Sequence, residues 1–187
     1  MENNKNREWA LKIALLGDSA VGKTSLINKY ITNAFKESYT PTLGVNIVSK
    51  YIKLREIDSK IHLLLWDIAG QDKYELTRQS FFQGCAGALL VYDKTRYSTF
   101  QQIKIKWLED FKRFSRPDGV YVLIGNKLDL EESIKVTLEE GKLLSQEINA
   151  ADFIETSAKY GENVEEAFKK LVLCILMKNN VSLERTY

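Results

Sequence analysis

Four short motifs with residue types suited to phosphate and base chemistry follow one another along this chain. They are GDSAVGKT at 17–24, WDIAGQ at 66–71, NKLD at 126–129 and ETSAK at 155–159, and each comes after an apolar run. In open α/β sheets, ligands bind at the carboxyl ends of the strands. We therefore expect the four motifs to meet in one pocket.

The first motif fits the phosphate-binding P-loop pattern, in which two glycines flank four residues and a Lys-Thr pair follows. Its glycines let the backbone curl so that successive amides point at phosphate oxygens, and the helix that follows adds its partially positive N-terminus. Lys23 would reach the β- and γ-phosphates, and the Thr24 hydroxyl would ligate Mg²⁺. The other residues expected to bind the nucleotide in this segment are Ser19, Ala20, Val21, Gly22 and Ser25.

The third motif indicates which base is bound. The carboxylate of Asp129 can accept two hydrogen bonds, and the N1 and exocyclic amino groups of guanine supply two donors side by side. Adenine offers no such pair on that edge. Because NKLD follows an apolar run and a P-loop lies upstream, the sequence favours GTP over ATP, and a P-loop ATPase or kinase is the less favoured reading.

Apolar runs predict the strands that must position these motifs. The runs are nearly continuous, as in parallel strands that are buried on both faces. Strands are expected at 11–16, 61–66, 86–92, 120–124 and 152–154. A more amphipathic run near 46–55 should pair antiparallel with 61–66 at the sheet edge.

Apolar residues at three- and four-residue spacing predict helices between the strands. They are expected near 23–33, 74–82, 100–114, 137–149 and 164–175. This alternation predicts a doubly wound α/β fold, with a mostly parallel six-stranded sheet, one antiparallel edge strand and about five helices. The 187 residues fit one domain, residues 1–187, with its core at about 8–178.

Composition excludes several classes of protein. A net charge of +2 gives no electrostatic argument for nucleic-acid binding, and no apolar run approaches the ~20 residues that span a bilayer. No secretory signal is visible, so a cytoplasmic protein is expected. We expect Cys85 and Cys174 to be buried free thiols, and the single histidine, His62, to be structural.

The motifs, in this order and together with YTPTLGV at 39–45, resemble those of small GTPases of the Ras superfamily, and most closely the Rab family. The likeness covers about residues 8–178. It implies a small G domain that binds GTP or GDP with Mg²⁺, hydrolyses GTP slowly, and controls the GTP-dependent binding of effectors in Rab-like membrane trafficking.

The resemblance also implies roles for individual residues. Thr42 would join Mg²⁺ to the γ-phosphate, Asp67 would hold Mg²⁺ through water, and the amide of Gly70 would meet the γ-phosphate. Gln71 would orient the attacking water. The catalytic set is then Gln71, Lys23 and Thr42, and the metal set is Thr24, Thr42 and Asp67. The further residues implied around the nucleotide are Phe35, Tyr39, Asn126, Lys127, Ser157, Ala158 and Lys159.

Partners are implied as well, namely an effector, an exchange factor and a GTPase-activating protein that contact the switch regions through Ile47, Trp66 and Phe81. Ile47 departs from the phenylalanine usual in Rabs, so effector identity is open. No arginine is obviously placed as an internal finger, so hydrolysis should be slow without an activating protein. A monomer is expected.

Two features leave alternatives open. Ala20 stands in the P-loop where many relatives have glycine, and this leaves open a nucleotide-binding scaffold with negligible hydrolysis. The last nine residues contain no cysteine, so no direct lipid anchor is visible. Attachment to membranes would then come through partners, or a prenylated tail is missing from the sequence.

Overall fold

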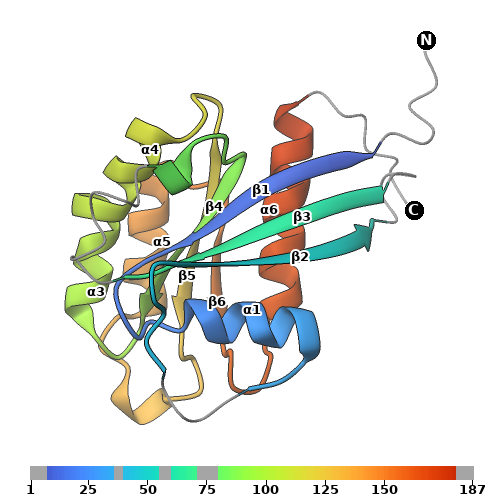
Figure 1. Cartoon of the computed structure of the whole chain (residues 1–187). Helices are drawn as coiled ribbons and strands as arrows, with labels where there is room; N and C mark the ends of the chain where they lie inside the picture. Colours follow the sequence, from blue (N-terminus) through green and yellow to red (C-terminus); the bar gives the residue numbers. More distant parts are fainter. Residues whose placement is uncertain (1–7, 36–39, 55–59, 71–79, 180–187) are drawn as a thin grey trace, which may run out of the picture.

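The apolar runs form the middle of a six-stranded sheet in the computed structural model of the chain (Figure 1). The strands are β1 (Trp9–Leu16), β2 (Val45–Lys53), β3 (Lys60–Ile68), β4 (Gly87–Asp93), β5 (Val120–Asn126) and β6 (Phe153–Thr156). Their order is β2-β3-β1-β4-β5-β6, with β2 and β3 antiparallel and all other neighbours parallel. The predicted doubly wound fold with an antiparallel edge strand is confirmed.

The structure describes residues 8–35, 40–54, 60–70 and 80–179. The predictions for Tyr39 and Gln71 lie outside these residues, as does most of the helix expected near 74–82. Residues 80–82 are helical, in agreement with the end of that helix.

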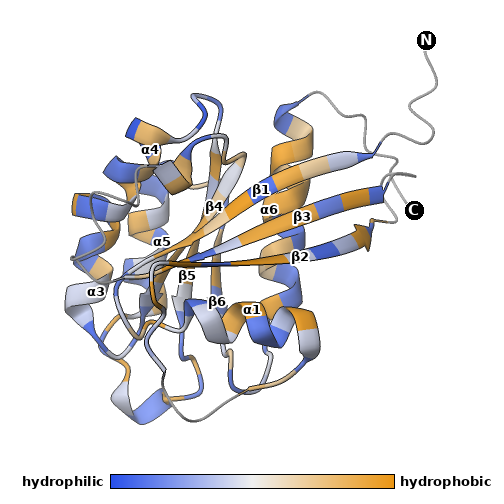
Figure 2. Cartoon of the chain, viewed as in Figure 1, coloured by the Kyte–Doolittle hydropathy of each residue, from blue (hydrophilic) through white to orange (hydrophobic). Residues whose placement is uncertain are grey.

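Burial along the strands follows their place in the sheet. Every residue of the central strand β4 is buried, whereas exposed and partly buried residues alternate along much of the edge strand β2. Figure 2 shows the same contrast, because the apolar colour of the central strands gives way to mixed colour on β2. A strand covered on both faces needs a continuous apolar run, and an edge strand does not.

Helices cover both faces of the sheet (Figure 1). They are α1 (Lys23–Thr32), α3 (Tyr97–Gln102), α4 (Glu109–Phe114), α5 (Leu138–Glu147) and α6 (Val164–Lys178). On one face, Leu26 of α1 and Phe168 of α6 pack into the larger core cluster. On the other face, Trp107, Phe111 and Leu144 belong to a second cluster. Burying each such side chain contributes about 1.5–3 kcal/mol.

The helix predicted near 100–114 is not uniform. Between α3 and α4 the chain forms a π-helical turn, η2 (Ile103–Leu108), so the regular spacing assumed from the sequence is wrong in its middle. The turn buries Ile103, Trp107 and Leu108 together. A short 3₁₀ turn, η3 (Glu131–Ser133), follows the NKLD motif.

The two thiols differ from the prediction in one respect. Both cysteines are free, and Cys85 is buried, which raises the pKa of its thiol to about 11. Cys174 is only half-buried on α6, because its position falls at the border of that helix's apolar face, so the expectation of a second buried thiol is wrong. Among the helices of the described part of the chain, none has the length and apolar character needed to cross a bilayer.

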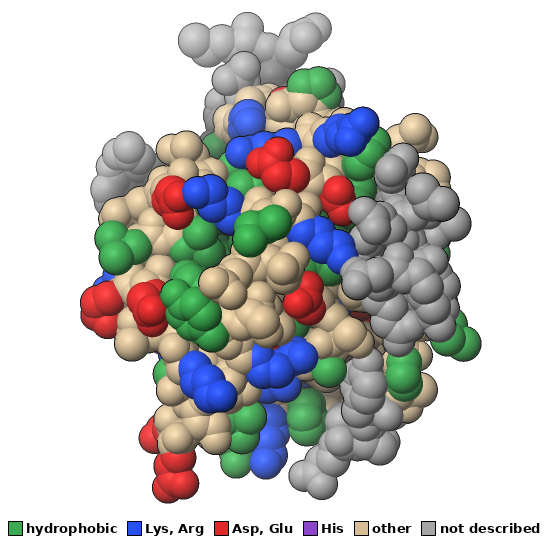
Figure 3. Space-filling view, turned by 90° about the vertical axis from the view of Figure 1, so that its left-hand side faces the viewer, with side chains coloured by type: hydrophobic (Ala, Val, Ile, Leu, Met, Phe, Trp, Pro, Cys, Tyr) green, Lys and Arg blue, Asp and Glu red, His purple; other side chains and the backbone are tan. Residues whose placement is uncertain are grey.

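Charges of both signs are interspersed on the face shown in Figure 3, which carries α3 and α4 in Figure 1. Some of them pair between elements. Lys104 of η2 and Glu147 of α5 form an exposed ion pair. Such pairs contribute little to stability, typically about 0–1 kcal/mol.

Candidate functional site

The carboxyl ends of β1, β3, β5 and β6 bring the four motifs around one cavity of about 650 Å³. Predicted site residues that line it are Ser19, Ala20, Gly22, Lys23, Thr24, Ser25, Phe35, Thr42, Gly70, Asn126, Lys127, Asp129, Ala158 and Lys159. Val21, Asp67 and Ser157 are buried behind this wall and contact residues that line it. Asn28, Thr40 and Leu130 also line the cavity, and sequence reasoning missed them.

The position of Asn28 could have been predicted, because it lies four residues after Thr24 on α1 and therefore on the same helical face. Thr40 lies within the recognised YTPTLGV segment and Leu130 directly follows NKLD, but no signal in the sequence indicated that their side chains would line the cavity.

The phosphate loop curls around the amine of Lys23. The Nζ atom donates hydrogen bonds to the carbonyl oxygens of Gly17 (2.7 Å) and Asp18 (2.8 Å), and the side chain is buried. Gly22 has φ 103°, and a Cβ there would lie 2.2 Å from the amide nitrogen of Asn126. Only glycine satisfies both demands, so the motif's second glycine is required by the fold of the loop.

Ala20 adopts a left-handed backbone conformation with φ 61°. This conformation costs a non-glycine residue roughly 1–2 kcal/mol. Alanine therefore restricts the backbone of the loop at this position, because it occupies the left-handed region, which glycine adopts most easily. Other contacts must hold the loop in place.

The three residues predicted to bind a metal come together at the ends of α1 and β3. The Thr24 hydroxyl donates to Oδ2 of Asp67 at 2.5 Å, and the Thr42 hydroxyl lies 3.1 Å from that of Thr24. Oδ1 of Asp67 is buried and has no hydrogen-bond partner among the residues that the structure describes. A buried, unpartnered carboxylate oxygen beside two hydroxyls is a set of hard oxygen donors that fits Mg²⁺.

The environment of Asp67 also acts on its ionisation. Burial raises the pKa of this carboxyl, and the hydrogen bond from Thr24, the charge of Lys23 and the hydrogen bond from Thr42 lower it again. Burial prevails, so the pKa lies above its usual range. In the absence of a cation, the ionised carboxylate is therefore a cost to the fold.

A buried amide joins the phosphate side of the cavity to the base side. The Nδ2 atom of Asn126 donates to the carbonyl of Val21 at 2.8 Å. Its Oδ1 atom accepts from the Thr156 hydroxyl at 3.1 Å and from the backbone N–H of Ala158 at 3.2 Å. Both ends of the amide are therefore engaged within the protein, and Asn126 ties three of the four motifs to one another.

The predicted base-reading carboxylate is held by a neighbouring motif. The Ser157 hydroxyl donates to Oδ1 of Asp129 at 2.7 Å and accepts from the backbone N–H of Tyr160 at 3.1 Å. Ser157 is fully buried, so it orients Asp129 from behind and does not face the cavity. Phe35 and Lys159, which the resemblance implies to lie around the nucleotide, line the same cavity.

Asp93, at the end of β4, connects several segments around the site. Its carboxylate accepts from the backbone and hydroxyl of Thr95, from Arg96 Nε (2.9 Å) and from Lys127 Nζ (2.7 Å). Burial raises the pKa of Asp93, but these hydrogen bonds outweigh it and hold the pKa below its usual range. This role of Asp93 could not be predicted from the sequence, because Lys127 of the NKLD motif lies far from Asp93 along the chain.

The predicted partner face is a surface of β2 and β3. Ile47 is 50% exposed and lies opposite Trp66 in the β2–β3 register, and the ring centroid of Trp66 is 6.0 Å from that of Phe81. The amine of Lys12 lies 3.7 Å from the centroid of the Trp66 ring. The three apolar residues therefore form one surface, with a cation supporting its tryptophan.

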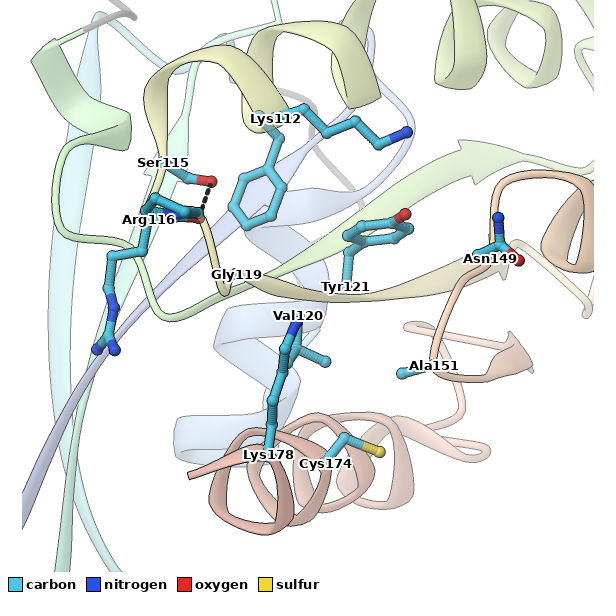
Figure 4. Close-up of a pocket in the computed structure, with 12 residues that line it drawn as sticks. Lys112, Ser115, Arg116, Gly119, Val120, Tyr121, Asn149, Ala151, Cys174 and Lys178 are labelled. Atoms are coloured by element: carbon cyan, nitrogen blue, oxygen red, sulfur yellow. Dashed lines mark hydrogen bonds between the residues drawn. The ribbon is translucent and has the colours of Figure 1, made fainter. Parts of the chain in front are cut away.

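A second cavity, of about 530 Å³, lies beside α4, the start of β5 and the end of α6 (Figure 4). Lys112, Tyr121, Cys174 and Lys178 are among the side chains that line it. It contains no residue of the four motifs. The cavity at the carboxyl ends of the strands is therefore the candidate site.

Comparisons with known proteins find relatives that match most of the chain. A model of the Ras family matches residues 12–177, which include all four motifs. The chain is 42% identical over 165 residues to Ras-related protein RABA6b of Arabidopsis thaliana, covering 88% of this chain and 70% of that protein. It is 37% identical over 181 residues to RABA5e of the same plant, with 97% and 80% covered. It is 36% identical over 175 residues to RabC of Dictyostelium discoideum, with 92% and 88% covered.

The raised pKa of Asp67 predicts the effect of Asp67→Asn on stability. A carboxyl with a raised folded pKa contributes less stability as pH rises from about 3.9, the unfolded value, through the folded value. At pH 7, without cation or nucleotide, Asp67→Asn should therefore be more stable than wild type, because the variant carries no charge that burial disfavours. Urea unfolding in a chelator at pH 4 and pH 7 measures this, and the advantage of the variant should grow with pH.

The matched control is Asp118→Asn, because Asp118 is an exposed carboxylate paired with Arg116 and has a lowered pKa. The control should not stabilise the protein at pH 7. An Asp67→Asn variant less stable than wild type at pH 7 would contradict the cost assigned to the buried carboxylate.

Proposed function

The chain belongs to the Ras family, as the sequence resemblance predicted, and we propose that it is a molecular switch that binds GTP or GDP with Mg²⁺ and slowly hydrolyses GTP. Family membership implies guanine-nucleotide binding in general. One observation carries the finer proposal. A phosphate loop, an unpartnered buried carboxylate flanked by two hydroxyls, and an oriented Asp129 share one cavity.

Phosphate binding falls to the loop and its lysine. The backbone of residues 17–22 surrounds the Lys23 amine, and α1 begins at that residue with its partially positive N-terminus toward the cavity. The amine already lies among main-chain oxygens, so a phosphate would find a positive charge with a fixed position.

The residues that would hold Mg²⁺ are Thr24, Thr42 and Asp67. Bound there, the cation supplies neutralisation of the negative charge on the phosphate oxygens. The chain's own contribution is the spacing of these three oxygen-bearing side chains. Asp67 is held by the hydroxyl of Thr24, and Thr42 comes from a segment between α1 and β2 that would be held only while the γ-phosphate is present.

Hydrolysis requires positioning more than covalent help from the protein. Gly70 lies against the phosphate loop so closely that a Cβ there would be 2.4 Å from the carbonyl carbon of Asp18. We assign Gln71, the next residue, to orient the attacking water. Lys23 and Thr42 would complete the catalytic set.

Switching follows from the two segments that meet the γ-phosphate. Loss of that phosphate removes a shared tether for Thr42 and Gly70, and a partner that contacts the tethered segments then binds only the GTP state. We assign effector, exchange-factor and activating-protein contacts to the face of Ile47, Trp66 and Phe81. A monomeric protein that acts in the cytoplasm or peripherally at membranes, in Rab-like trafficking, completes the proposal.

One observation leaves an alternative open, namely a scaffold that binds nucleotide but hydrolyses it negligibly. The left-handed Ala20 makes the phosphate loop harder to form than in a chain with glycine there. Measurement of hydrolysis by the protein alone separates the two functions.

Replacing Gln71 with leucine tests the switch. Gln71→Leu should leave GTP binding intact and slow hydrolysis strongly, because leucine cannot orient a water molecule. Single-turnover hydrolysis of preloaded GTP with Mg²⁺ measures this, against an expected wild-type rate on the order of 10⁻⁴ s⁻¹. Equal rates in both proteins would remove Gln71 from the mechanism, and tight GTP retention without hydrolysis in wild type would favour the scaffold.

Replacing Asp129 with asparagine tests the assignment of the base. The change replaces a hydrogen-bond acceptor with a donor. Asp129→Asn should therefore lose affinity for GDP by about 1–3 kcal/mol or more and gain affinity for xanthosine diphosphate (XDP). Competition binding with the two nucleotides measures the preference. The control is Asp152→Asn, which lies at the other end of β6 from the site and should keep the wild-type preference. An Asp129→Asn variant with the same preference as wild type would refute the assignment.

A further inference from the structure

Arg96, directly before α3, bridges two parts of the nucleotide site. Its Nε atom donates to Oδ2 of Asp93 at 2.9 Å, and its Nη2 atom donates to the carbonyl of Ser19 in the phosphate loop at 2.8 Å. The guanidinium presents several donors in a fixed fork, so one side chain can hold a carboxylate and a carbonyl at once. Arg96 thus fixes the orientation of the peptide that joins Ser19 to Ala20.

That peptide is a part of the loop that needs holding. Ala20 has φ 61°. This backbone conformation is energetically unfavourable for any residue with a side chain, whereas glycine adopts it at little cost. Asp18, two residues before Ala20, is held as well, because Trp107 Nε1 donates to its Oδ1 atom at 2.7 Å and Gly70 packs on the Asp18–Ser19 peptide. Arg96 contacts the carbonyl of the peptide that directly precedes Ala20.

Asp93 gives this contact a connection to the base side. Its side chain is 1% exposed, and its Oδ2 atom accepts from Lys127 Nζ at 2.7 Å as well as from Arg96. Lys127 belongs to the NKLD motif and lines the cavity. One buried carboxylate therefore aims two cations, one toward the phosphate loop and one toward the base loop.

We propose that Arg96 is a positioning residue that holds the Ser19–Ala20 peptide in its nucleotide-binding conformation, with Asp93 coupling this hold to the base loop. The inference rests on the proposed function, because it concerns retention of the same nucleotide. Arg96 is not assigned as an internal arginine finger. Both of its contacts are with the protein, and they serve the shape of the loop.

Dissociation of fluorescently labelled GDP tests the proposal. Arg96→Ala should release GDP about tenfold faster than wild type, which corresponds to about 1.4 kcal/mol. Arg96→Lys should fall between the two, because a compact ammonium cannot bridge both acceptors as the fork does. Arg116→Ala is the matched control, since this arginine pairs with exposed Asp118 beside the second cavity, and it should release GDP at the wild-type rate.

Two further readouts separate positioning from general damage to the fold. Arg96→Ala should weaken the binding of GDP and of inosine diphosphate (IDP), which lacks the exocyclic amino group, by the same factor. The reason is that Asp129, which is assigned to bind that amino group, is unchanged in the variant. In an Ala20→Gly background, loss of Arg96 should accelerate release by a smaller factor, because glycine adopts φ 61° at little cost. Single-turnover hydrolysis of bound GTP should fall far less than the loss of about 10³–10⁵-fold that removal of a catalytic arginine finger causes.

The outcomes are distinct. GDP release unchanged in Arg96→Ala, or accelerated equally with alanine and glycine at position 20, overturns the inference while the proposed function stands. If Arg96→Ala does not fold by circular dichroism, Arg96→Lys decides in the same assay. A wild-type protein that binds no GDP refutes the proposed function itself.

Discussion

One buried amide, that of Asn126, is the interaction on which the geometry of the site depends. It accepts from β6 and from the loop after it, and it donates to the phosphate loop at Val21. These segments follow β1, β5 and β6; β5 and β6 are neighbours in the sheet, whereas β4 separates β1 from β5. Because both polar ends are satisfied in a buried setting, the amide gains the full value of its hydrogen bonds and makes any other arrangement of the loops costly.

The order of the strands explains why one amide suffices. Parallel strands end at the same edge of a sheet, so β1, β4 and β5 deliver Gly17, Asp93 and Asn126 to one region without long excursions of the chain. Buried polar groups then adjust the final positions. Asp93 and Asn126 are almost fully buried, and each binds groups on other segments.

The strands and the membership of the site were predictable because their signals are local. Continuous apolar runs predict β4 and β5. A phosphate loop is predicted from a few neighbouring residues, among them Gly22, Lys23 and Thr24. The supporting contacts were not predictable in the same way. The Arg96–Ser19 and Trp107–Asp18 bonds join residues 77 and 89 positions apart, and neither pair has a spacing or residue type that marks it. Cys174 was misassigned because helical spacing alone does not separate the border of an apolar face from its centre.

The π-helical turn η2 carries Trp107, which reaches Asp18 from the middle of an otherwise α-helical segment. Such a turn holds one more residue per hydrogen-bonded ring than an α-helix does. Removing one residue would regularise the helix and change the direction of the side chains within the turn, since successive residues of an α-helix differ by about 100°. A single-residue deletion in this segment would therefore preserve the helix and still move the Trp107 indole away from Asp18 in the phosphate loop. This matters for protein engineering and for the interpretation of gaps in sequence alignments.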